Sequence, residues 1–89
     1  MIKEIFNFDE RQHLIDETHK ANSYLSREYV EQVINEAFPE TLPCFTFEFT
    51  KNSKRACCVI TGENNQKFTP SQLPILARNF YYKQIRRYL

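Results

Sequence analysis

The feature of this chain that most restricts its fold is a change of hydrophobic period at Cys44. Before it, apolar side chains recur at helical spacing, as at Val30, Val33 and Ile34. After it, the phenylalanines of residues 45–49 stand at every second position. A period of about 3.6 is typical of a helix, whereas a period of two is typical of a strand with one buried face. The order of these patterns predicts an α+β protein.

A β-hairpin is predicted from the phenylalanine strand into residues 55–61. We place the centre of its turn at Asn52-Ser53. The opposed pairs are then Phe49 with Ala56, Phe47 with Cys58, and Phe45 with Ile60. This register makes one face apolar throughout, whereas a slip by one residue would bury Glu48. Residues 62–65 read as a turn, and residues 66–69 as a short third strand.

Two helices are predicted before the hairpin. Asp9 followed by Gln12 has the form of a capping box, which indicates a helix that begins near Glu10. Its apolar face is thin, so we expect it at the rim of the core. Ser26 is a second N-cap, and the helix after it ends at Phe38, because the proline that follows disfavours helical geometry there.

A third helix is predicted near the end of the sequence. Thr69, Pro70 and Gln72 combine an N-cap, a proline at the first helical position and a capping-box glutamine. Pro74 removes a backbone hydrogen bond, so either the first turn is irregular or the regular helix begins nearer Leu73. Beyond it one arc is apolar and comprises Leu73, Leu76, Ala77, Phe80, Tyr81, Ile85 and Tyr88.

These segments predict a single domain over residues 1–89, because a chain this short has no room for two independent cores. We expect a small antiparallel sheet of two or three strands packed against helices, in the order α-α-β-β-(β)-α. Residues 2–8 are either a short strand or an extended lead-in. The phenylalanine face is expected to lie under the second and last helices, in one core made of Val33, Ile34, Phe38, Phe45, Phe47 and Phe80.

The charges are divided unevenly along the chain. Residues 1–50 carry ten acidic and four basic side chains, whereas residues 51–89 carry eight basic side chains and one acidic one. Such a division indicates either a basic surface for an anionic partner, or two halves that neutralise each other within the fold or across a homodimer.

Few residues of this sequence are suited to catalysis or to metal binding. The three cysteines, Cys44, Cys57 and Cys58, are an odd number without a signal peptide, which favours reduced thiols in the cytoplasm. Two histidines assemble no zinc motif, and one glycine excludes most glycine-rich nucleotide cradles. We therefore expect no enzyme, no cofactor, no metal and no membrane span.

The strongest functional pattern is the basic arc of the last helix. The candidate binding residues are Arg78, Tyr82, Lys83, Arg86 and Arg87, extended by Lys51, Lys54 and Arg55 at the hairpin loop. Cations interleaved with a tyrosine suit either an acidic protein surface or the phosphates and bases of a nucleic acid. The leading hypothesis is a non-enzymatic protein that binds another protein, as a small regulator or inhibitor of phage or mobile-element type. The alternative is a nucleic-acid-binding domain that uses this helix.

Overall fold

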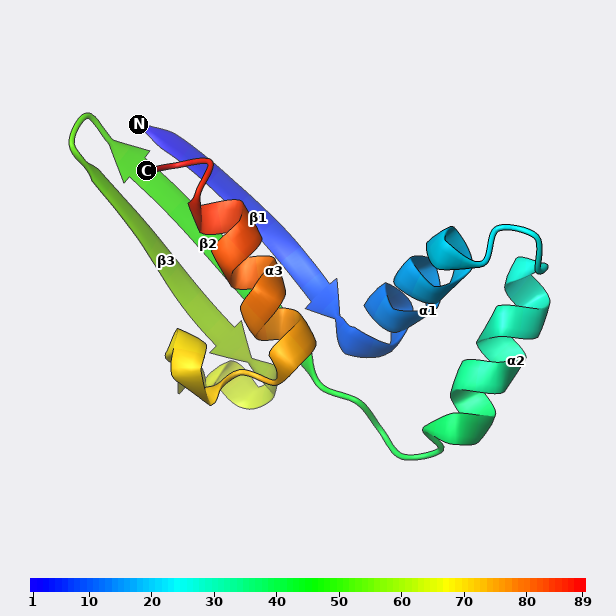
Figure 1. Cartoon of the computed structure of the whole chain (residues 1–89). Helices are drawn as coiled ribbons and strands as arrows, with labels where there is room; N and C mark the ends of the chain where they lie inside the picture. The colour runs from blue at the N-terminus through cyan, green and yellow to red at the C-terminus, as the bar shows by residue number, and fades with distance from the viewer. The chain divides into compact units, whose positions relative to one another are not determined.

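The computed structural model describes residues 1–89 and confirms the α+β class (Figure 1). Its regular elements are β1 (Ile2–Asp9), α1 (Glu10–Ala21), α2 (Arg27–Ala37), β2 (Cys44–Asn52), β3 (Arg55–Gly62), β4 (Lys67–Phe68) and α3 (Ile75–Ile85). Short 3-10 turns lie at Glu63–Asn65 and Pro70–Gln72. The sheet has four strands instead of the predicted two or three. The predicted order α-α-β-β-(β)-α is also wrong, because a full strand, β1, precedes the helices.

The chain forms two compact units. The sheet unit comprises Met1–Phe8 and Cys44–Leu89, and the helical unit comprises Asp9–Pro43. The single domain expected from chain length stays a prediction.

The strands of the sheet unit lie in the order β1-β2-β3-β4. Figure 1 shows β1 and β2 running in opposite directions, and β3 is antiparallel to both β2 and β4. Residues 2–9 join the sheet because Phe6 and Phe8 add two rings to its apolar face. The Phe6 ring centroid lies 5.8 Å from that of Phe49, and the Phe8 centroid lies 6.1 Å from that of Phe47.

The predicted hairpin register is wrong by two residues. Phe47 lies opposite Ile60 and Phe49 opposite Cys58, and Asn52 pairs with Arg55. The two-residue loop is therefore at positions 53–54. Since side chains alternate with a period of two, a shift of two residues leaves every side chain on its predicted face. The observed register sets two of the most buried residues, Phe47 and Ile60, directly opposite each other.

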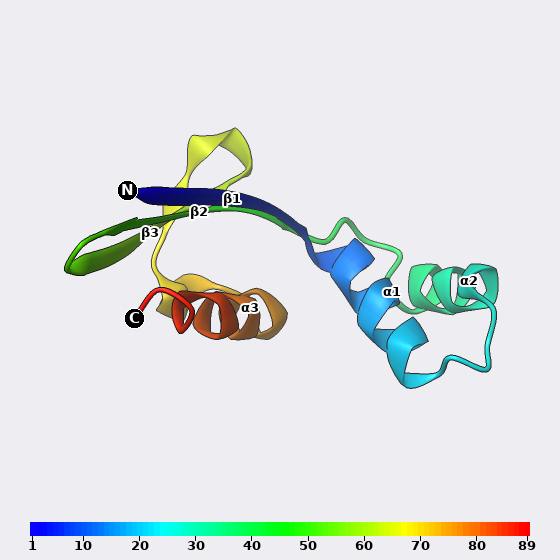
Figure 2. The ribbon, with the colours of Figure 1, turned by 90° about the horizontal axis from the view of Figure 1, so that it is seen from above.

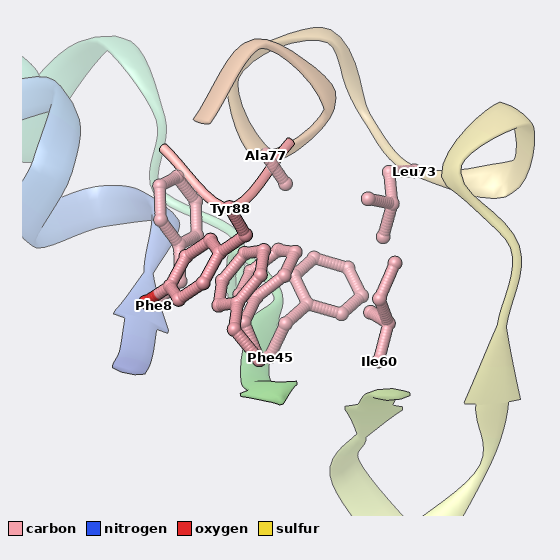
Figure 3. Packing of buried hydrophobic residues seen from close by; sticks show 8 residues of the cluster. Phe8, Phe45, Ile60, Leu73, Ala77 and Tyr88 are labelled. Atoms are coloured by element: carbon pink, nitrogen blue, oxygen red, sulfur yellow. The ribbon is translucent and has the colours of Figure 1, made fainter. Parts of the chain in front are cut away.

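The phenylalanine face is covered by α3. Figure 2 shows the helix lying along one face of the sheet. The buried cluster between them is shown in Figure 3 and comprises Phe8, Phe45, Phe47, Phe49, Ile60, Leu73, Ala77 and Tyr88. The apolar arc predicted for the last helix is confirmed, because all seven of its members belong to this cluster or pack against it.

The predicted start of α3 is confirmed in part. Thr69 and Gln72 form the expected capping box, in which the Thr69 amide donates to Gln72 Oε1 at 2.8 Å. This box caps only a 3-10 turn. Leu73 and Pro74 are extended, and the regular helix begins at Ile75. A proline cannot donate the amide that a continuous helix would need at this position, so the helix starts after it.

In the helical unit, α1 and α2 begin at the predicted caps and pack on each other. The amide of Gln12 donates to Asp9 and that of Tyr29 donates to Ser26. The buried residues of this unit are Ile15, Val30 and Ile34. The expected common core is therefore wrong: Ile34 packs with α1, while Val33 and Phe38 are 42% and 37% exposed. Although the apolar face of α1 is thin, it supplies Ile15, and Val30 and Ile34 of α2 are buried with Ile15 instead of in the sheet cluster.

Two arginines fasten the helical unit. Arg11 of α1 donates to Asn35 Oδ1 at 2.9 Å and to the carbonyl oxygens of Phe38 and Glu40 at 2.6 and 2.5 Å. Those carbonyls lie just beyond α2 and have no helical partner, so the guanidinium satisfies them. Arg27 donates to Asp16 at 2.5 Å, which lowers the pKa of that carboxyl.

Candidate interaction surface

The two units have opposite charge. The sheet unit carries nine basic and three acidic side chains, a net charge of +6. The helical unit carries eight acidic and three basic ones, a net charge of −5. The ion pairs join Lys3 to Glu48, and Arg27 to Asp16 and Glu31. No cation of α3 or of the hairpin loop is neutralised by one of these pairs.

The side of α3 that faces away from the sheet is both basic and apolar. We call it the α3 outer face, and it consists of the exposed residues Ile75, Asn79, Tyr82, Lys83, Arg86 and Arg87. Ile75 is 67% exposed and Tyr82 is 46% exposed, although both are large apolar side chains. The Tyr82 ring rests edge-on against Tyr81, with centroids 5.2 Å apart. Tyr82 is therefore held by Tyr81 while nearly half of it stays exposed.

Four of the five predicted α3 residues belong to this face, and Arg78 does not. Its Nη2 donates to the carbonyl oxygens of Ser71 and Leu73, both at 3.2 Å, and its side chain is half-buried. Those carbonyls precede the helix and lack helical partners because Pro74 interrupts the backbone. Arg78 therefore holds the start of α3 in place, and we leave it out of the proposed surface.

The hairpin cations lie beside the C-terminal end of α3. Figure 1 shows the β2–β3 loop and the C-terminus at the same end of the sheet unit. They form a cleft of about 330 Å³, the hairpin cleft, lined by Lys51, Ser53, Lys54, Arg55, Ala56, Tyr88 and Leu89. The structure thus brings together all three predicted hairpin residues. Tyr88 was not predicted to line this cleft, because its position on the apolar arc indicates only a core residue.

Tyr88 fixes this end of the helix to the first strand. Its hydroxyl donates to Glu4 of β1, and burial, together with this carboxylate, raises the pKa of the phenol. Cations near a helix C-terminus stabilise the helix dipole by about 0.3–1 kcal/mol each. That effect accounts for Arg86 and Arg87 near the end of α3, but not for the cations of the hairpin loop.

A second concave surface lies in the helical unit. The helical groove is a cavity of about 130 Å³ between α1 and α2, lined by Thr18, Leu25, Tyr29, Val30 and Val33. Tyr29 and Val33 are exposed, as is Tyr24 in the α1–α2 connection. This groove was not predicted from the sequence. The sequence pattern that indicates it is the width of the apolar face of α2, because Tyr29 and Val33 extend this face beyond the side that α1 covers.

The thiols lie on both faces of the sheet. Cys57 is exposed on the face away from α3, and Cys58 packs against the buried cluster. Burial raises the pKa of Cys58 to about 12, so this thiol stays protonated at neutral pH. The register places Cys44 beyond the end of the β2–β3 ladder that is farther from the loop, and no disulfide is formed.

No group of three or more metal-ligating side chains is assembled, and no helix is both long and apolar enough to cross a membrane. Comparisons of this chain with protein-family models, with curated proteins and with solved structures give no match.

Proposed function

We propose that this protein is a non-enzymatic interaction protein that binds another protein through the α3 outer face, and that it acts as a small regulator or inhibitor. One observation carries the proposal: Ile75 and Tyr82 are exposed on the same helix face as cations that form no ion pair. Protein interfaces typically combine a buried aromatic anchor with a charged rim. Tyr82 supplies such an anchor, and Lys83 and Arg86 supply such a rim.

The proposal implies an acidic, amphipathic partner surface. Unpaired cations attract a partner of opposite charge and increase its rate of association. The two exposed apolar side chains favour a partner that also offers apolar surface. Phosphates alone would leave Ile75 exposed to water, so the apolar part of this face favours a protein.

The test uses a labelled acidic amphipathic helical peptide, with fluorescence anisotropy as the measurement. We expect the peptide to bind wild type at physiological salt. Tyr82→Ala, which leaves the charge unchanged, should weaken binding about tenfold or more, the effect of losing an interface anchor. Arg86→Glu should weaken it as well. Lys20→Glu makes the same change in net charge on α1 and is the matched control, so an equal loss from Lys20→Glu would contradict the proposal.

The second candidate function is nucleic-acid binding, and the hairpin cleft is the observation that favours it. Lys51, Lys54 and Arg55 add three cations beside the end of α3. The same assay with single- and double-stranded oligonucleotides of about 20 nucleotides separates the two functions. Binding of either oligonucleotide should fall steeply with salt through counterion release. Tight oligonucleotide binding at physiological salt, without peptide binding, would replace the proposed function by this one.

A further inference from the structure

The helical groove and the α3 outer face have complementary chemistry. The groove is lined almost wholly by apolar side chains, among them Tyr29 and Val33, and it belongs to a unit with a net charge of −5. The α3 outer face offers Ile75 and Tyr82 and belongs to a unit with a net charge of +6. The two surfaces are therefore both apolar, and the units that carry them have opposite net charge.

We propose that the occupant of the helical groove is the α3 outer face of a second copy of this chain. This inference rests on the proposed function, because it uses the same α3 outer face, and it names a second copy of the chain as one partner of that face. An amphipathic helix that lies in an apolar groove between two helices is a common mode of recognition. In this arrangement Tyr82 of one copy enters the groove beside Tyr29 of the other.

The charges around both surfaces fit this pairing. Glu36 stands one turn beyond Val33 on α2, and Glu17 adjoins Thr18 on α1; both are exposed and neither forms an ion pair. Lys83 and Arg86 are likewise exposed and unpaired on α3. Docking would bring two carboxylates toward two cations, whereas two copies of either surface would repel each other.

Each copy carries one groove and one α3 outer face, so a closed pair contains two identical groove–α3 contacts. The Kd of such a pair depends on ionic strength, because at 0.1 M salt the attraction between exposed charges decays over a Debye length of about 10 Å. Its apolar part does not depend on salt in this way. The pairing therefore predicts a dimer that weakens, and is not strengthened, as salt is added.

The experiment is sedimentation equilibrium of the full chain at several salt concentrations. We expect twice the chain mass of 10.7 kDa at low salt and a Kd that rises with salt. The basic-side variant carries Lys83→Glu and Arg86→Glu, and the acidic-side variant carries Glu17→Lys and Glu36→Lys. Each variant alone should be monomeric, because both of its surfaces then have the same charge.

Mixing the two variants is the decisive measurement. The intact groove of the basic-side variant meets the intact α3 of the acidic-side variant. The other contact joins a groove made basic to an α3 made acidic, which are also complementary, so a mixed dimer should form. Tyr82→Ala serves as a second test that leaves the charges unchanged. It should raise the Kd about a hundredfold, because about tenfold is lost at each of the two contacts. Circular dichroism checks that each variant is folded.

A monomeric wild type over the whole salt range would overturn the inference, as would a dimer whose Kd none of these variants changes. The acidic peptide separates this failure from that of the proposed function. If wild type is monomeric and still binds the peptide through Tyr82, only the second copy is wrong as the partner. If it neither dimerises nor binds the peptide, both proposals fail.

Discussion

Replacing Phe47 by alanine tests the assignment of the sheet faces. The Phe47 side chain is 0% exposed, and its ring centroid lies 5.2–6.4 Å from those of Phe8, Phe45, Phe49 and Phe80. Phenylalanine-to-alanine substitutions in such sites cost about 3–5 kcal/mol, because the buried area is lost and a cavity remains. A chain of this size has a total stability of about 4–13 kcal/mol. The substitution should therefore remove a large part of it.

The assay is urea unfolding followed by circular dichroism. With a slope near 1 kcal/mol per molar urea, the midpoint should fall by about 3–5 M, so a marginal protein would be unfolded without urea. Val59→Ala is the matched control, because Val59 is 45% exposed on the opposite face and should cost less than about 1 kcal/mol. If Val59→Ala were as costly as Phe47→Ala, the faces would be assigned the wrong way round.

Three further predictions follow from the sheet unit. A Cβ at Gly62 would lie 2.4 Å from Phe68 Cε2, so Gly62→Ala should lower the free energy of unfolding by about 1–3 kcal/mol. Phe68→Leu in the same chain should recover part of this loss in urea unfolding. If the costs of the two substitutions were strictly additive, the steric explanation would be refuted. Cys58, with its pKa raised to about 12, should be alkylated at pH 8 at least about tenfold more slowly than exposed Cys57. Peptide mass spectrometry follows both rates, and equal rates in urea are the control. Equal rates in the folded protein would contradict the burial of Cys58. Burial and Glu4 raise the pKa of Tyr88, so the folded state favours the neutral phenol and stability falls as pH rises above about 10. Tyr88→Phe should reduce the dependence of the urea midpoint on pH. An unchanged dependence would contradict this.

Much of the local structure could be predicted from the residues alone. The N-caps at Asp9 and Ser26, the end of α2 at Phe38 and the capping box of Thr69 lie where their motifs indicate. The inward face of Phe45, Phe47 and Phe49 was also predictable, although the register was not, because an error of two residues preserves the face. These features depend on neighbouring residues, so a short window contains their cause.

The candidate surface was predictable to the same extent. A helical projection separates the apolar arc of α3 from its outer face and correctly exposes Tyr82, Lys83 and Arg86. It does not reveal that Arg78 is held by Ser71 and Leu73, because this depends on the break at Pro74 and on the path of the preceding turn.

By itself, then, the sequence determined the helices, the phenylalanine strand with its buried face, and the division of charge. Tertiary structure decided which segments meet: β1 added two rings to the sheet, α2 packed on α1, and the hairpin cations came to lie beside Tyr88. The physical reason is that caps and periodicity act over a few residues. Packing instead selects among many apolar surfaces of similar hydrophobicity, and the choice depends on shape, loop length and the positions of distant segments.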